Sequence, residues 1–138
     1  MMSALDTFLS AHSDVLILLA RVLVSALFLL TGWQKMTGFA GTVGYMRSVG
    51  TPLPEVAAVV SVVMELFVGA ALLLGIWVRP LALLLFLFTF GTALIGHHFW
   101  TMQAAARHEN QLNFFKNLGI MGGLLLLSIT GAGTYALA

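Results

Sequence analysis

The stretch from Pro54 to Gly75 constrains the fold more than any other part of the chain. Apart from Glu55 at its start it is almost entirely apolar, and it carries a single carboxylate near its centre, Glu65. A membrane-spanning helix needs roughly 20 mostly apolar residues at a rise of about 1.5 Å each. Counted from Glu55, Glu65 lies about 15 Å deep, close to the midplane of a bilayer. A carboxylate there costs on the order of 2.5–3.5 kcal/mol, so it requires a partner or a protein-lined cavity.

Composition places the whole chain in a membrane. Apolar residues make up 60% of the sequence and charged residues 8%, and the mean hydropathy is +1.03. Soluble domains are nearer 45–50% apolar and about 25% charged. We therefore expect a multi-pass protein of a bacterial-type cell membrane, with the lipid bilayer as its main partner. There is no basic run that would indicate nucleic-acid binding.

Four apolar segments are long enough to span the bilayer. We expect helices over residues 15–33, 54–75, 80–98 and 113–131, with a polar link over 101–111 before the last one. Phe39, Val43 and Met46 recur at helical spacing, which predicts a short interfacial helix between the first two spans. The expected fold class is all-α, an antiparallel four-helix transmembrane bundle, in a single domain over residues 1–138.

Two of the predicted helices carry a narrow stripe of small and polar residues at helical spacing. In the first span the stripe is Arg21, Ser25, Phe28, Gly32 and Lys35. In the second span it is Ala58, Ser61, Glu65 and Gly69. Both stripes are expected to face the bundle interior, where small residues permit close contact and charges avoid lipid. Arg21 has an alternative, since its long side chain could snorkel to the nearer surface.

In an antiparallel bundle, most of the remaining polar residues fall near one end. We call the membrane face at the N-terminus side A and the opposite face side B. The predicted pocket opens to side B, and an Arg21–Glu65 ion pair is expected at its floor. The alternative is that these side chains simply collect at a wet interface. The candidate site residues are Arg21, Lys35, Glu65, His97, His98, Asn113, Lys116 and Asn117.

Several kinds of chemistry are not expected. The chain has no cysteine, which excludes disulfides and thiolate metal sites and removes the usual iron–sulfur ligands. His97 and His98 are adjacent and point about 100° apart on a helix, so they cannot easily bind one ion together. We expect no metal site, no haem and no iron–sulfur cluster. No nucleotide-binding, zinc-protease or hydrolase motif is present, and catalytic residues remain unknown.

The order of these features resembles the DoxX family of small four-helix membrane proteins. The matching features are Arg21, Gly32-Trp33-Gln34-Lys35-Met36, Gly50-Thr51-Pro52, Glu65 with Gly69 and Leu73-Leu74-Gly75, and Asn113 with Lys116-Asn117-Leu118. The resemblance covers nearly the whole chain. It implies a membrane subunit linked to quinone-coupled oxidation, in which a quinone is the candidate cofactor and a soluble or membrane protein is the redox partner. Without cysteine the chain could not run thiol chemistry alone.

Three functions compete at this point, and whether the protein is an enzyme stays open. The first is a quinone- or redox-associated membrane subunit that binds a small ligand in the polar pocket. The second is a transporter or binder of a small anion or lipid-like molecule, motivated by Arg21, Lys35 and Lys116 around one cavity. The third is a membrane anchor for a soluble oxidoreductase. An oligomer is an open alternative, because Gly119, Gly122 and Gly123 offer a packing surface within the bundle or between chains.

Overall fold

The regular secondary structure of the described chain is all helical. The computed structural model describes residue 1 and residues 3–138, and within them it contains helices and no strands. Four helical segments are long and apolar enough to cross a membrane, which confirms the predicted fold class. In chain order the elements are α1 (Ala4–Ala11), α2 (Ser13–Thr37), α3 (Phe39–Ser48), α4 (Pro54–Val62), η1 (Val63–Val68), α5 (Gly69–Leu74), α6 (Val78–Gly96), η2 (Phe99–Thr101) and α7 (Ala104–Thr130).

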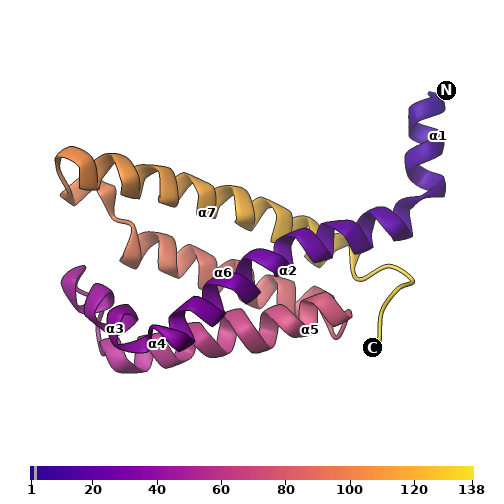
Figure 1. Cartoon of the computed structure of the whole chain (residues 1–138). Coiled ribbons are helices and arrows are strands. Elements are labelled where there is room, and N and C mark those ends of the chain that lie inside the picture. Colours follow the sequence, from indigo (N-terminus) through magenta and orange to yellow (C-terminus); the bar gives the residue numbers. More distant parts are fainter. Residues whose placement is uncertain (2) are drawn as a thin grey trace.

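The four spans form a ring in which each contacts two neighbours. The continuous segment α4–η1–α5 makes the second span and packs against α2 on one side and α6 on the other, while α7 contacts both α6 and α2. Figure 1 shows the spans running lengthwise, with both chain termini at the end that carries α1. The apolar core lies nearer that end and contains Phe28, Leu72, Val78, Ala82, Leu85, Leu124 and Leu127.

Both predicted stripes face the interior, as expected. The buried residues of α2 are Arg21, Ser25, Phe28 and Gly32. Those of the second span are Ala58, Ser61, Glu65, Gly69 and Leu72. Glycine allows the two spans to approach closely, because a Cβ atom at Gly32 would lie 2.9 Å from the Cβ of Glu65. The same atom at Gly69 would lie 3.2 Å from the Cβ of Phe28.

The last span begins earlier than predicted. Residues 104–111 were expected in a polar link, but they form the first turns of α7. Alanine, arginine and glutamate are good helix formers, and this local preference prevails over the polar composition. At 27 residues α7 is about 40 Å long, more than the roughly 30 Å hydrocarbon core, so its N-terminal turns extend beyond the core. The short helix α3 appears where it was predicted.

Two terminal features were not predicted. The helix α1 begins with a capping box in which Ser3 and Asp6 bond each other's backbone, and these hydrogen bonds lower the pKa of Asp6. Its apolar residues Leu5, Phe8 and Leu9 are exposed on one face. At the other end the final residues fold back on the bundle, where the N–H of Thr134 donates to the Asp14 carboxylate at 2.9 Å.

The glycines of α7 do not pack closely within this chain. A Cβ atom at Gly119 or Gly122 would meet nothing within 4 Å, and one at Gly123 would only reach Val24 at 3.7 Å. Tight packing of these glycines inside the bundle was therefore a wrong alternative for Gly119 and Gly122. Packing against a second copy stays a prediction.

Membrane orientation follows from the distribution of positive residues. Lys35 and Lys116 line a cavity described below, so the comparison depends on Arg47 and Arg107 at side B against Arg79 at side A. The positive-inside rule therefore predicts that side B is cytoplasmic and that both termini are outside. An alkaline phosphatase fusion at the C-terminus should be active and a green fluorescent protein fusion there should be dark. If the green fluorescent protein fusion is fluorescent and the phosphatase fusion is inactive, the C-terminus is cytoplasmic and the predicted orientation is wrong.

Candidate ligand-binding site

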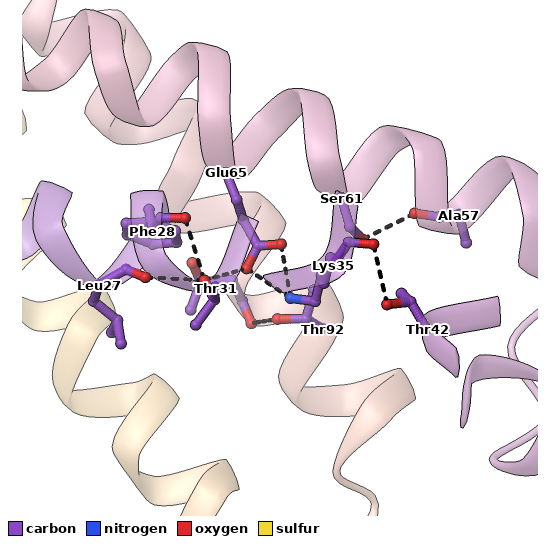
Figure 2. Close-up of polar contacts among 10 residues, drawn as sticks. Leu27, Phe28, Thr31, Lys35, Thr42, Ala57, Ser61, Glu65 and Thr92 are labelled. Atoms are coloured by element: carbon purple, nitrogen blue, oxygen red, sulfur yellow. Dashed lines mark hydrogen bonds and ion pairs between the residues drawn. The ribbon is translucent and has the colours of Figure 1, made fainter. Parts of the chain in front are cut away.

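An ion pair lies in the interior of the bundle. The Lys35 ammonium donates to both carboxylate oxygens of Glu65, each at 2.7 Å (Figure 2). The Glu65 side chain is 6% exposed and that of Lys35 is 31% exposed, so the carboxylate is buried and the ammonium reaches an open space. The Thr31 hydroxyl donates to Glu65 Oε1 at 2.8 Å. The carboxylate therefore has the partners that burial at this depth demands.

The second span is locally distorted at this carboxylate. Residues Val63–Val68 form a π-helix, and Glu65 lies in its first turn. π-helical turns are rare, arise as bulges within α-helices and are frequent at functional sites. Gly32 faces the same turn and leaves room for the Glu65 side chain to come against α2. The local backbone and the small neighbour together position the carboxylate.

The ion pair opens into a cavity of about 740 Å³ between α2, η1, α6 and α7, which we call the polar chamber. Its polar lining residues are Thr31, Lys35, Glu65, Thr89, Thr92, His97, Asn113, Lys116 and Asn117. Six of the eight predicted site residues thus lie around one cavity, and the two that do not are Arg21 and His98. A cavity of this size is within the range of small-molecule sites.

Several polar groups of the chamber have unused hydrogen-bonding capacity. Thr89 is 3% exposed, and its hydroxyl has no hydrogen-bond partner among the described residues. Buried hydroxyls are nearly always paired, so this one is an exception in a residue that lines the cavity. In the same described part of the chain, no side-chain hydrogen bond forms at Asn113, Lys116 or Asn117. The other unpaired buried hydroxyl, that of Ser25, lies outside the chamber.

The side chain of Asn110 determines which ring nitrogen of His97 donates a hydrogen bond to it. The Asn110 amide nitrogen donates to the Ala106 carbonyl at 2.9 Å, which turns its oxygen toward His97. His97 Nδ1 lies 2.9 Å from that oxygen and must donate to it, because an amide oxygen only accepts. The neutral ring therefore keeps Nε2 as an acceptor, and the second nitrogen's role is set by the first.

His98 makes different hydrogen bonds from His97. Its Nε2 donates to the Val49 carbonyl at 2.9 Å, and the Tyr45 hydroxyl donates to the Gly96 carbonyl at 2.8 Å. Both bonds tie α3 to the end of α6. Burial and the nearby Glu109 carboxylate raise the pKa of Tyr45, so the hydroxyl keeps the proton it donates. His98 thus positions α3 and does not face the polar chamber.

A second cavity of about 600 Å³ lies beside the first, between α3, α4 and α6, and we call it the apolar chamber. Its lining includes Met46, Val49, Ala57, Val60, Gly91 and Ile95. Lys35, Phe88, Thr92 and His97 line both chambers, so the two cavities meet at these residues.

The predicted Arg21–Glu65 pair was wrong. Arg21 is 1% exposed and donates to four backbone carbonyls, those of Leu72, Leu73, Ala132 and Tyr135. Side chains on a helix lean toward its N-terminus. Arg21 therefore leans toward side A and away from Glu65, whereas Lys35, near the other end of α2, leans back toward it. Two of the acceptors end α5, where unpaired carbonyls attract a cation.

Sequence reasoning missed Thr31, Thr89 and Thr92 as lining residues. Threonine is frequent in membrane helices and gives no signal by itself. Thr31 was detectable, since it precedes Gly32 and lies one helical turn before Lys35, on the side of α2 that faces the chamber. The π-helix gave no sequence signal.

Comparison with known proteins gives one family. The DoxX family model matches residues 16–98, more than half of the chain. Inner membrane protein YphA of Escherichia coli strain K12 is 49% identical over 127 residues, which covers 92% of this chain and 91% of that protein. Inner membrane protein YqjF of the same strain is 42% identical over 127 residues, covering 90% of each. No solved structure matches the chain.

Removing the carboxylate of the ion pair should destabilise the protein. Glu65→Gln leaves the Lys35 ammonium without its counter-charge, at an expected cost of about 2 kcal/mol in the free energy of unfolding. Lys35→Met combined with Glu65→Leu should recover part of this loss. The measurement is equilibrium unfolding in mixed detergent micelles. The exposed Arg47–Glu55 pair is the control, and Glu55→Gln should change stability by less than about 1 kcal/mol. A double-mutant cycle in which the effects of the Lys35 and Glu65 substitutions on the free energy of unfolding are additive would contradict the ion pair.

Arg21 should act independently of Glu65. Arg21→Met leaves four backbone carbonyls without their guanidinium donor and releases the C-terminal residues, so it should lower stability and expose residues 131–138 to carboxypeptidase. Combined with Glu65→Gln its effect should be additive within about 0.5 kcal/mol, because the two groups share no partner. A coupling energy well above that value would indicate that Arg21 and Glu65 do interact, contrary to this prediction.

Proposed function

This chain belongs to the DoxX family of multi-pass cell-membrane proteins, and on that premise we propose that it binds a quinone-type carbonyl ring in the polar chamber. In this proposal it serves as the membrane subunit of a redox system. The observation that carries the proposal is the Lys35–Glu65 ion pair, which is buried at mid-depth and opens into a cavity with unpaired polar groups. A charged pair is expensive in this environment, and such groups in membrane interiors are functional candidates.

The residues of the chamber suit a ring that bears carbonyl or hydroxyl groups. An ammonium has three donors and Lys35 uses two on Glu65, so the third is left for a carbonyl oxygen. Lys116, Asn113 and Asn117 are further donors in the same lining. On the acceptor side, Glu65 Oε2 receives a bond only from Lys35 within the described residues. Together these groups can bond an oxygen that accepts and one that donates.

A quinone supplies reversible two-electron, two-proton chemistry, and the chain's own part is to hold the ring and handle protons. Glu65 and the Nε2 atom of His97 are acceptors to which a ring hydroxyl can pass a proton. The Lys35 ammonium donates to both oxygens of Glu65, and Thr31 donates to Oε1, so the carboxylate is held in one orientation. With no cysteine the chain holds no thiol as an electron donor. The proposal therefore includes a partner protein that exchanges electrons with the ring.

The alternatives from the sequence have less support. An anion binder was motivated by three cations around one cavity, but Arg21 is bonded elsewhere and Lys35 is neutralised by Glu65. Lys116 is then the one uncompensated cation among the described lining residues. A membrane anchor for a soluble oxidoreductase would have no need of a buried ion pair beside a cavity. Neither alternative uses the unpaired hydroxyl of Thr89.

Thr89→Val separates a ligand-binding role from a structural one. The variant removes an unpaired buried hydroxyl, so stability should stay equal or rise. Affinity for dimethoxy-methyl-benzoquinone, measured by equilibrium dialysis in detergent, should fall roughly three- to tenfold, as expected for one lost hydrogen bond. The matched control is Thr37→Val, whose hydroxyl bonds the Trp33 carbonyl outside both chambers. Wild-type protein that binds no quinone would refute the proposal.

A further inference from the structure

We infer that the ligand is an amphiphile, with its polar head in the polar chamber and a flexible apolar chain in the apolar chamber. The inference rests on the proposed function for the identity of the head. It adds the second cavity, which the proposed function does not use. It also assigns a ligand class, since a ring or head without a chain would leave that cavity without a role.

Continuity of the two chambers is the first support. Lys35, Phe88, Thr92 and His97 line both of them, so a ligand whose head reaches the Lys35 ammonium lies at the mouth of the apolar chamber. Figure 2 shows the Lys35 ammonium against the Glu65 carboxylate, at the residue shared by both chambers. A single molecule can therefore pass from one chamber to the other at the ion pair.

The chemistry of the second lining is the next support. Most of its hydroxyls are satisfied by backbone carbonyls: Thr42 donates to Gly38 at 3.2 Å, Ser61 to Ala57 at 2.9 Å and Thr92 to Thr89 at 2.8 Å. The apolar chamber therefore presents few free donors, in contrast to the unpaired Thr89 hydroxyl of the polar chamber. A surface of this kind offers an alkyl or prenyl chain packing contacts and offers a polar group little.

Glycines shape the chamber for a chain. Gly41 and Gly91 line it, and a Cβ atom at either would meet nothing within 4 Å. The absence of side chains there keeps a groove open on α3 and α6. Lipid is as apolar as this groove, so a chain gains little from leaving lipid as such. The chain instead contributes to binding through packing contacts in the groove, and it positions the attached head at the ion pair.

A leucine placed in the groove tests the inference. Gly91→Leu fills the apolar chamber from a position with free space, and it touches no group of the proposed head site. Two ligands are compared in the same detergent: dimethoxy-methyl-benzoquinone without a chain and its decyl derivative. Gly91→Leu should weaken binding of the decyl compound at least about tenfold and change the chainless compound by less than about twofold. For each ligand the affinity of the variant is divided by that of the wild type, so partition of the ligand into micelles cancels.

Gly122→Leu is the matched control, since this glycine also has open space around it but lines neither chamber. It should change neither affinity. If wild-type protein binds the chainless ring and Gly91→Leu changes both affinities alike, or neither, the inference fails and the proposed function stands. If wild-type protein binds neither compound, both fail.

Photolabelling gives a readout that does not depend on a variant. A decyl quinone with a diazirine at the chain end should label residues of α3, α4 and α6, such as Met46, Val60 and Ile95. Excess chainless quinone should displace this label, because one molecule occupies both chambers. Displacement by phospholipid with the ring still bound would instead make the apolar chamber a lipid site and overturn the inference.

Discussion

The burial of charge away from water is the constraint on which the rest of this structure depends. A lone carboxylate at the depth of Glu65 is unstable, and the pair with Lys35 removes most of the cost only if geometry and hydrogen bonds are good. The surrounding features serve that geometry. Gly32 lets α2 approach the second span, Thr31 adds a bond to the carboxylate, and the π-helix sets the local backbone of Glu65. The chamber beside the pair is what remains open.

Arg21 is a second buried charge, and it is paired with backbone carbonyls instead of a carboxylate. Helix ends leave carbonyls unpaired, and the guanidinium gathers carbonyls from the end of α5 and from the residues that follow α7. Arg79 acts in the same way at the end of α7, where it donates to the carbonyls of Ser128, Ile129 and Thr130. Side A is therefore closed by cations on helix C-termini, which the helix dipole favours. Side B, where the chambers lie, has no such closure in the described part of the chain.

Helical periodicity predicted which faces are buried, but it did not predict which charges meet. The stripes through Arg21 and Glu65 were correct because residue spacing alone determines a helix face. The predicted Arg21–Glu65 pair was wrong because residue spacing does not include the lean of side chains along the helix axis. On α2 both Arg21 and Lys35 lean toward the N-terminus of the helix, so Arg21 leans away from Glu65 and Lys35 leans toward it. The acceptors of Arg21 also include carbonyls after α7, and nothing in the sequence of that segment indicates that its carbonyls accept from a cation. The predicted partner of Glu65 was therefore wrong, and its depth in the bilayer stays a prediction.

The contrast between the two arginines and Lys35 bears on function. Arg21 and Arg79 spend several donors on backbone carbonyls, an arrangement that stabilises the fold and leaves little for a ligand. Lys35 gives two donors to Glu65 and reaches an open cavity with its third. Purely structural pairing would be expected to satisfy the neighbouring groups as well, yet Thr89 in the same lining is buried and unpaired. Hydrogen-bonding capacity left unused in a membrane interior is costly, and this cost is one physical argument for our proposal that the chamber binds a ligand.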